Sequence, residues 1–152
     1  MRIAVIADSH NRVPPALPGL LGEADEIREM VKQPLLKAFA LQMTGESFRE
    51  LGYRHPFGDQ WRGIQDLEPD KLRRDDLLSF IDQVDENAFL ALVPHGTPKE
   101  VARQIKAYAD AGVRVMTLLD YGGMAGLKFA AKSAARLREL EAETLRLMSG
   151  DT

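Results

Sequence analysis

The sequence predicts a helix-rich α/β protein with few parallel strands. Residues 3–7 form an unbroken apolar run that ends at polar residues, which is typical of a strand buried on both faces. From residue 97 onward the pattern is helix, strand, glycine loop and helix, the order in which parallel α/β folds are built. The length of 152 residues suits one domain. We therefore expect a single domain over residues 1–152, with strands at 3–7 and 113–119.

The composition is that of a globular protein and excludes several classes of function. Apolar residues make up 45% and charged residues 28%, and 20 basic against 23 acidic side chains give a net charge of −3. This balance argues against nucleic-acid or membrane-surface partners. The absence of cysteine rules out disulfides, thiolate metal sites and a cysteine nucleophile. The N-terminal residues lack the pattern of a signal peptide, so a cytoplasmic protein is expected.

The first two thirds of the chain read mainly as helices around one long loop. Prolines at positions 14, 15 and 18 predict a loop or a short helix entrance. Helical periodicity over 24–43 is interrupted by Pro34, which indicates two helices or one kinked helix. Residues 52–69 are rich in aromatic residues and glycine, without clean periodicity, as in an ordered functional loop. Helix is predicted over 70–84, whereas 87–93 fit either a helix or a buried strand.

The most specific local signal is a helix start at Thr97. Pro98 occupies the first helical position and Glu100 follows Thr97 by three residues, which is the pattern of a capping box. Gly112 marks the end of this helix. The strand over 113–119, a break at 121–123 and a long helix over about 124–148 follow.

Residues 1–27 resemble the opening of a calcineurin-like metallophosphoesterase. The resemblance rests on the segment Met-Arg-Ile-Ala-Val-Ile-Ala-Asp-Ser-His that begins the chain, with the Asp-x-His motif at Asp8 and His10. It implies that Asp8 and His10 are ligands of a divalent metal that activates water toward phosphate. The further Gly-Asp, Gly-Asn-His and paired-His segments of that family do not occur in order here. Asp8 and His10 can equally cap the end of a strand.

Residues 28–152 resemble the C-terminal part of a luciferase-like oxidoreductase, nearest to the group that uses a deazaflavin coenzyme. The matching segments are His-Pro-Phe-Gly at 55–58, Trp-Arg-Gly-Ile-Gln-Asp at 61–66, Pro-His-Gly-Thr-Pro-Lys-Glu-Val-Ala at 94–102 and Ala-Tyr-Ala-Asp-Ala-Gly-Val-Arg at 107–114. The resemblance implies part of a TIM barrel and a reductase or monooxygenase that binds a deazaflavin or FMN. Because the earlier strands of such a barrel have no counterpart, the chain resembles a chimeric or truncated fragment that is not catalytic alone.

A glycine loop supplies the predicted coenzyme contacts. Gly122 and Gly123 lie between a strand and a helix, where backbone N–H groups can face a phosphate. Lys128 begins a basic stripe that continues with Lys132 and Arg136 at four-residue steps. We therefore predict coenzyme contacts at Gly122, Gly123 and Lys128, although such stripes also serve as solvated helix faces.

His55 is the predicted catalytic residue, since an imidazole in an aromatic loop can act as a general acid or donate to a coenzyme carbonyl. A role in shaping the loop is the alternative, with Phe57 and Trp61 as loop anchors. His95 is interpreted as a helix-entry residue bonded to backbone. Asp120 stands where barrel enzymes place active residues, and can equally cap the glycine turn.

Three functions stay open from the sequence. The first is a flavin- or deazaflavin-linked oxidoreductase or a remnant of one, and the second is a metal-dependent phosphoesterase that acts through Asp8 and His10. The third is a non-catalytic, chimeric or designed α/β interaction module whose recognisable pieces have lost their chemistry, with no cofactor as one possibility. A sheet of few strands leaves unpaired edges, and a homodimer that completes the sheet would cover them.

Overall fold

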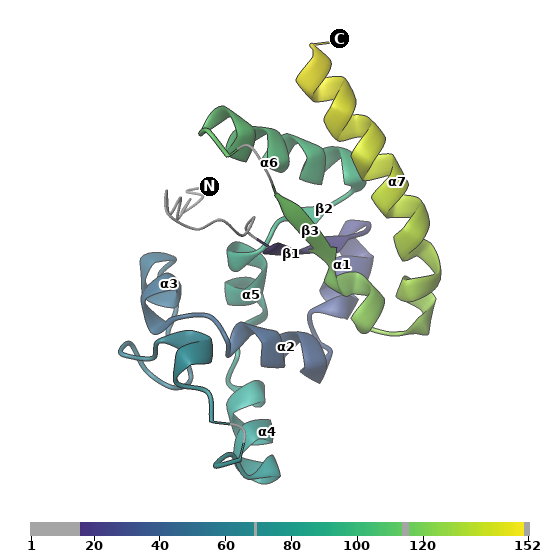
Figure 1. The fold of residues 1–152 in the computed structure, drawn as a ribbon. Coiled ribbons are helices and arrows are strands. Elements are labelled where there is room, and N and C mark those ends of the chain that lie inside the picture. The colour runs from purple at the N-terminus through teal and green to yellow at the C-terminus, as the bar shows by residue number, and fades with distance from the viewer. Residues whose placement is uncertain (1–15, 69, 114–115, 151–152) are drawn as a thin grey trace.

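The fold is described by a computed structural model, which covers residues 16–68, 70–113 and 116–150. It confirms a helix-rich α/β protein with a small parallel sheet (Figure 1). The strand predicted at residues 3–7 lies outside the described residues. The elements, in chain order, are β1 (Ala16–Leu21), α1 (Ala24–Met30), α2 (Pro34–Ala40), α3 (Gly45–Glu50), η1 (Gly63–Gln65), α4 (Arg74–Asp82), α5 (Glu86–Leu92), β2 (His95–Gly96), α6 (Pro98–Asp110), β3 (Thr117–Asp120), η2 (Tyr121–Met124) and α7 (Leu127–Ser149).

The three strands are parallel, and β1 lies between the other two. Leu20 pairs with His95 of β2, and Gly19 pairs with Asp120 of β3. In a TIM barrel, consecutive strands joined by one helix are neighbours, but here β1 separates β2 from β3 although α6 connects them. The order β2-β1-β3 is the one found around the switch point of doubly wound sheets. The sheet thus shares parallel βα construction with a barrel, but not its neighbour order.

The prediction of a loop or helix entrance at the N-terminal prolines was wrong for Pro18, which lies within β1. The amides of Leu20 and Gly22 donate to the carbonyl oxygens of Pro94 and Gly96, each at 3.0 Å. Amide groups of even-numbered residues in this strand therefore face the side of β2, and the nitrogen of Pro18 is on that side. Since β2 begins opposite Leu20, no ladder bond is required from Pro18. A proline is tolerated where the neighbouring strand has not yet begun.

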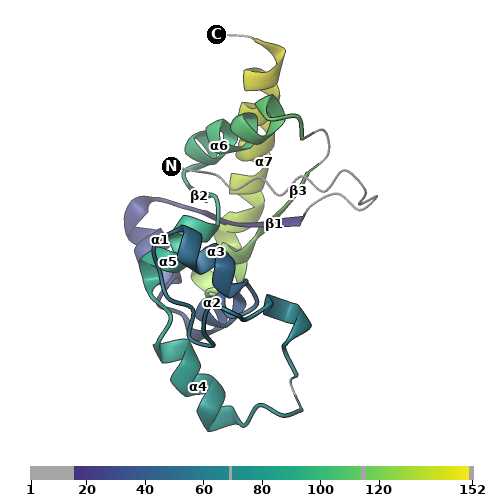
Figure 2. The same ribbon diagram turned by 90° about the vertical axis from the view of Figure 1, so that its left-hand side faces the viewer.

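Both faces of the sheet are covered by helices, because successive residues of β1 point to opposite sides. Leu20 packs into a large core formed mainly with α1 to α5, to which α7 adds Phe129, whereas Leu21 packs into a smaller core with α6 and the later part of α7. Figure 2 shows α6 on one side of β1 and the helices α2, α3 and α5 on the other. The smaller core contains Val101, Ala102 and Leu140.

Most helix predictions are confirmed, with boundaries moved by local capping. Pro34 begins α2 and so divides residues 24–43 into two helices. The ambiguous residues 87–93 are mainly helical, because Asp85 caps α5 through the amide of Asn87 at 2.8 Å. Thr97 and Glu100 form the predicted capping box of α6.

The last strand and helix begin later than predicted. Residue 113 lies outside β3, which starts at Thr117, and residues 114–115 are not described. The glycine break at 121–124 is a turn of 3₁₀ helix, so α7 begins at Leu127 rather than near residue 124. Among the described residues, no helix combines the length and hydrophobicity needed to cross a lipid bilayer.

Candidate functional site

The carboxyl ends of the three strands form the candidate site, which we call the strand-end site and define as residues 22–23, 96–97 and 120–126. Because the strands are parallel, their carboxyl ends meet at one edge of the sheet. Each strand leads within a few residues into a helix, namely α1, α6 or α7. Ligands of parallel α/β folds bind at this edge, and in open sheets at the switch in strand order.

Asp120 organises the turn that follows β3. One carboxylate oxygen accepts a hydrogen bond from the amide of Gly122 at 2.9 Å, and the other accepts one from the hydroxyl of Ser133 on α7. This confirms the interpretation that Asp120 caps the glycine turn. Both carboxylate oxygens of Asp120 thus accept hydrogen bonds that attach η2 to α7.

The predicted coenzyme contacts at Gly122 and Gly123 lie side by side in η2 but in different surroundings. A Cβ atom on Gly122 would lie 2.9 Å from a carboxylate oxygen of Asp120 and 3.2 Å from the sulfur of Met30, so glycine permits a close approach to α1. A Cβ on Gly123 would meet nothing nearer than 3.9 Å. Since the amide of Gly122 already donates a hydrogen bond to Asp120, its contact with a phosphate stays a prediction.

The basic stripe of α7 forms ion pairs with acidic residues of α1, although Lys128 and Lys132 stay largely exposed. Lys128 forms an ion pair with Glu29, and its ammonium lies 4.8 Å from the centre of the Phe129 ring. Lys132 contacts Glu26 at 2.7 Å. Sequence reasoning missed this pairing, although the three-residue spacing of Glu26 and Glu29 on α1 is a signal that the two helices can match. A coenzyme phosphate would compete with Glu29 for Lys128, so that contact also stays a prediction.

Arg136 joins α7 to both β1 and α1 at the strand-end site. Its guanidinium donates to the carbonyl oxygen of Leu21 at 2.9 Å and forms an ion pair with Glu26. The hydrogen bond from Lys132, together with the Glu23 amide and Arg136, lowers the pKa of Glu26 to about 2. Glu26 is therefore a fixed anion at neutral pH and links α1 to α7.

His55 lies in the aromatic loop, defined as residues 52–66, and only 1% of its surface is exposed. Its ring meets Phe48 edge-on at 4.7 Å and stacks on Trp61 at 6.0 Å between ring centres. The amide of Phe57 donates to Nδ1 at 3.1 Å, which leaves the proton of the neutral ring on Nε2. Nε2 makes no hydrogen bond within the described part of the chain.

Burial lowers the pKa of His55, and the backbone carbonyls of Ala40 and Leu41 only partly oppose this effect. A neutral, enclosed imidazole suits the loop-shaping alternative. A general acid must reach the reacting group, and this ring is surrounded by protein. Catalysis by His55 stays a prediction that requires the aromatic loop to open.

The roles expected of the other aromatic and histidine residues are confirmed. The indole of Trp61 donates to the carbonyl oxygen of Leu41 at 2.8 Å, and the ring of Phe57 packs 4.3 Å from those of both Trp61 and Phe80. His95 bonds to backbone, with Nδ1 3.0 Å from the carbonyl oxygen of Val93.

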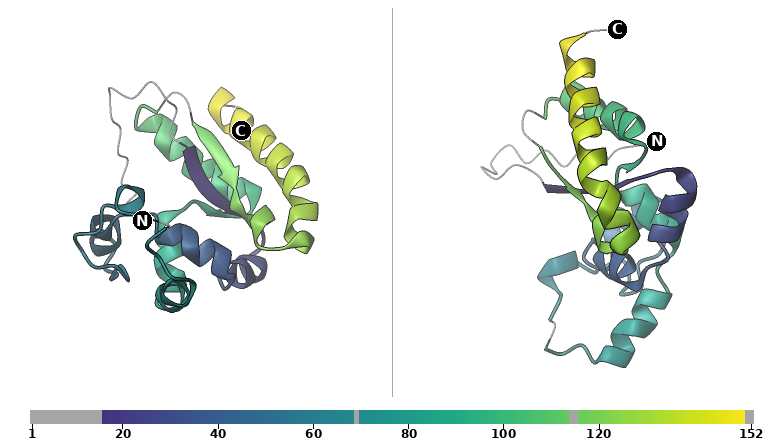
Figure 3. Two further views of the ribbon diagram at one scale, coloured as in Figure 1. Left: turned by 60° about the horizontal axis from the view of Figure 1, so that its bottom comes forward. Right: turned by 90° about the vertical axis from the view of Figure 1, so that its right-hand side faces the viewer.

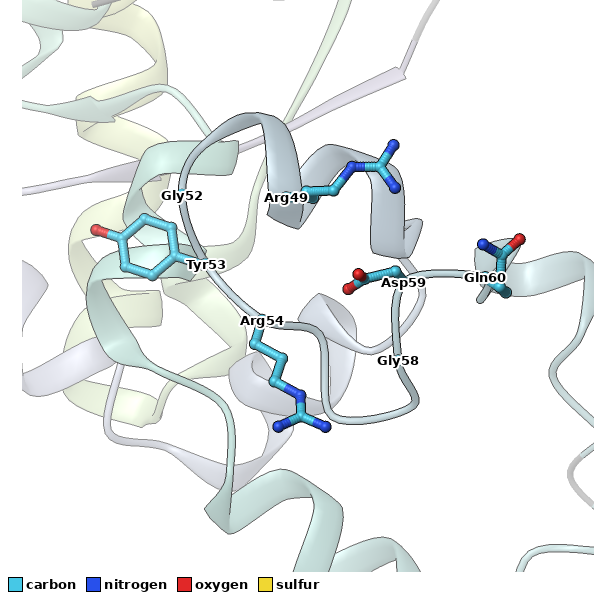
Figure 4. Close-up of a pocket in the computed structure, with 7 residues that line it drawn as sticks. All are labelled: Arg49, Gly52, Tyr53, Arg54, Gly58, Asp59 and Gln60. Atoms are coloured by element: carbon cyan, nitrogen blue, oxygen red, sulfur yellow. The ribbon is translucent and has the colours of Figure 1, made fainter.

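A pocket of about 720 Å³ that the sequence did not indicate lies beside the aromatic loop and opens to solvent. Figure 4 shows Arg49 and Arg54 extending in different directions, with Asp59 between them, so its charged groups do not converge on one point. Its lining residues are Arg49, Gly52, Tyr53, Arg54, Gly58, Asp59 and Gln60.

The predicted metal ligands Asp8 and His10 lie outside the described residues. Within residues 16–68, 70–113 and 116–150, no three histidine, aspartate or glutamate side chains gather where they could hold a metal ion. A divalent metal at Asp8 and His10 therefore stays a prediction.

The fold and the strand-end site define a helix-rich α/β unit built on a short parallel sheet. The chain is similar to curated proteins named phthiodiolone/phenolphthiodiolone dimycocerosates ketoreductase, which are oxidoreductases by name. Identity is 29% over 115 residues with those of Mycobacterium bovis (strain BCG / Pasteur 1173P2) and Mycobacterium tuberculosis (strain ATCC 25618 / H37Rv), which covers 74% of this chain and 30% of each relative. The protein of Mycobacterium sp. (strain JLS) is 31% identical over 96 residues, 63% of this chain and 25% of the relative.

The chain thus spans less than a third of the length of the curated relatives it matches. No family model matches it, and no solved structure matches it. The resemblance of residues 1–27 to metallophosphoesterases receives no support from these comparisons.

Proposed function

We propose that the chain is a fragment-like relative of luciferase-like flavin- or deazaflavin-dependent oxidoreductases, and that it forms part of a coenzyme site without running the reaction alone. The observation that carries this proposal is the strand-end site, where the carboxyl ends of three parallel strands lie at the same edge of the sheet. The similarity to proteins named as ketoreductases favours reduction of a carbonyl over the other chemistries of flavins and deazaflavins.

The backbone at the start of α7 supports a role in binding. Gly126 precedes this helix without a side-chain cap, and the first turn exposes Leu127 almost completely, at 91%. The unbonded N–H groups of a helix start favour an anion. A flavin or deazaflavin, when bound, would supply hydride transfer, and we expect Gly123, Gly126 and Lys128 to contact its phosphate-bearing side chain.

The side chains at the strand-end site explain why this part would not suffice for catalysis. Asp120 is bonded to Gly122 and Ser133, and Glu26 is held as an anion by Lys132 and Arg136. A general acid or base needs a pKa near the working pH and access to the reactant. Glu26, with a pKa of about 2, does not meet this condition.

The proposal is tested by measuring coenzyme uptake on the whole chain. FMN, the reduced deazaflavin coenzyme and Mn²⁺ are titrated separately, while the melting temperature and the fluorescence of the single tryptophan, Trp61, are followed. A ligand at a hundred times its dissociation constant stabilises the fold by about 2.7 kcal/mol. We expect one of the two organic coenzymes to raise the melting temperature, and Lys128→Ala to weaken its binding.

Lys106→Ala on α6 is the matched control, because Lys106 is also an exposed lysine in an ion pair, with Asp110 at 2.8 Å. It should leave coenzyme binding unchanged. The absence of a melting shift with both coenzymes would contradict the proposal. Turnover of a ketone by the isolated chain with reduced coenzyme would contradict its second half, and a shift with Mn²⁺ accompanied by phosphodiester hydrolysis would favour the phosphoesterase hypothesis.

A further inference from the structure

The outer face of α7 carries a repeat that the fold does not use. Seven residues follow one another at alternating steps of four and three, which is the spacing of a coiled-coil seam. Such a seam keeps to one side of a helix over its whole length. The seam residues are Leu127, Ala131, Ala134, Arg138, Glu141, Leu145 and Met148.

This seam is exposed. Leu145 is 63% and Met148 51% accessible, and the other five residues are exposed as well. The residues that pack α7 onto the protein, Phe129 and Leu140, belong to a different face of the helix. In the right-hand view of Figure 3, α7 faces the viewer, and no other described element lies in front of it.

The two charged residues of the seam have no partner within the described chain. Arg138 and Glu141 take part in no ion pair or hydrogen bond among the described residues, whereas Lys128, Lys132 and Arg136 on the inner side are all paired. Charges at seam positions weaken a coiled coil unless opposite charges face them. A partner helix must therefore present a carboxylate to Arg138 and a cation to Glu141.

A second copy of α7 satisfies this requirement when the two helices run antiparallel. In the register in which Arg138 faces Glu141 of the second copy, the next two layers are matched in size as well. Ala134 then faces Leu145 of the second copy, and Ala131 faces Met148 of the second copy. Each of these three layers occurs twice by the two-fold symmetry. Small residues thus meet large ones in both apolar layers, and the only charges in the seam are neutralised. Leu127 lies beyond these paired layers.

A parallel pair of the same helices neither pairs opposite charges nor matches small side chains with large ones. In register, it would place Arg138 against Arg138 and Glu141 against Glu141, and it would face alanine with alanine at positions 131 and 134. The large side chains would face one another at the two ends of the pair, with Leu127 at one end and Leu145 and Met148 at the other. Like charges and unfilled layers both oppose this arrangement.

We propose that this protein forms a homodimer through an antiparallel pair of α7 helices, with Arg138 of each copy bonded to Glu141 of the other. Alanines beside the seam at positions 130, 135 and 142 are also exposed and let the helix backbones approach closely. The paired layers, residues 131–148, lie outside the strand-end site and away from the outer edge of β3, so the proposal does not depend on coenzyme binding. A homodimer that completes the sheet remains a different, untested prediction.

The mass of the whole chain in solution, measured by sedimentation over a range of concentrations, tests this proposal. We expect a dimer whose dissociation constant rises about a hundredfold or more in Glu141→Arg and in Arg138→Glu, because each change sets like charges against each other. The double variant Arg138→Glu with Glu141→Arg should restore the dimer, since the pair is only reversed. Glu139→Arg, an exposed change outside the seam, is the matched control and should leave the dimer intact.

Orientation is tested by disulfide crosslinking, which is simple here because the chain has no cysteine. Ala134→Cys combined with Leu145→Cys should crosslink two copies on oxidation, whereas Ala134→Cys alone should not. Circular dichroism on each variant checks that the helices are retained. A monomer at every concentration, a dimer unchanged by the single charge reversals, or crosslinking of Ala134→Cys alone would each overturn the proposal.

Discussion

The aromatic loop and α7 illustrate two ways of attaching a segment to the same fold. The aromatic loop packs the rings of Phe57 and Trp61 against His55, which is 1% exposed. By contrast, α7 buries Phe129 and Leu140, forms ion pairs with α1 on its inner side, and leaves Leu145 and Met148 exposed. The loop is thus complete within one chain, whereas α7 retains an unused apolar face. The loop should consequently be sensitive to single substitutions that the surface of α7 tolerates.

The largest effect on this contrast is expected from Phe48→Ala. Phe48 is 1% exposed and meets the His55 ring edge-on, so its removal leaves a cavity under the aromatic loop. Deletion of a buried phenylalanine side chain costs about 3–5 kcal/mol in the free energy of unfolding. Leu145→Ala on α7 should cost far less in the monomer, and urea unfolding of both variants measures the difference. Equal losses would mean that the two regions do not differ as described.

A smaller but more specific effect is expected from Gly63→Ala. Gly63 has a φ of +72°, and an added Cβ would lie 2.4 Å from the carbonyl oxygen of Gln42. Gly52 has a similar φ of +83° with nothing within 4 Å, so Gly52→Ala isolates the conformational cost of about 1–2 kcal/mol. Gly63→Ala should exceed that cost, because the loop must also move away from the backbone at Gln42, which follows α2. Thermal unfolding of the two variants tests this, and equal melting temperatures would contradict the close approach.

Acid should destabilise the aromatic loop through His55. Burial lowers the pKa of His55 in the folded protein, so the unfolded chain binds its proton more readily. The contribution of neutral His55 is complete above the unfolded pKa of about 6.5, and it decreases as the pH falls below that value, by at most about 1.4 kcal/mol per pH unit. His55→Asn keeps an acceptor for the Phe57 amide but does not titrate. Unfolding free energies between pH 5 and 8 should therefore depend less on pH in this variant.

The smallest effect is expected from Lys132→Ala on the inner side of α7. The Lys132 side chain is 59% exposed, and ion pairs of this kind contribute about 0–1 kcal/mol. Because its hydrogen bond is the main cause of the lowered pKa of Glu26, that pKa should rise toward its usual range. The stability that depends on Glu26 is present above pH 4.5 and is lost toward pH 2, and this loss should be weaker in the variant. Nuclear magnetic resonance titration of the carboxyl group measures the change.

Local signals were sufficient to predict much of the fold. The capping box at Thr97 and the proline at the start of α2 depend on residues within one helical turn, and both were found from the sequence. Strand β1 was missed because Pro18 is locally unfavourable, and only pairing with β2 and β3, far along the chain, makes a strand of it. Local periodicity cannot report such pairing.

The candidate site was harder to predict than the fold for the same reason. The basic stripe of α7 was recognised, but its partners on α1 lie about a hundred residues earlier in the sequence. His55 was correctly placed in an aromatic loop, yet its burial depends on Phe48 and Trp61 closing around it. In both cases the sequence identified the residues, but it could not indicate whether their charged or polar groups already have partners or are buried in the folded protein.

Neighbouring leucines in β1 have a consequence for how the sequence tolerates length changes. Leu20 packs into one core and Leu21, the next residue of β1, packs into the other. Deleting one residue from the middle of this strand would reverse the facing of every side chain upstream of the cut. Substitutions here can be absorbed by repacking, but an odd-numbered insertion or deletion would exchange the inner layers of the molecule, and should be excluded from any library built on this chain.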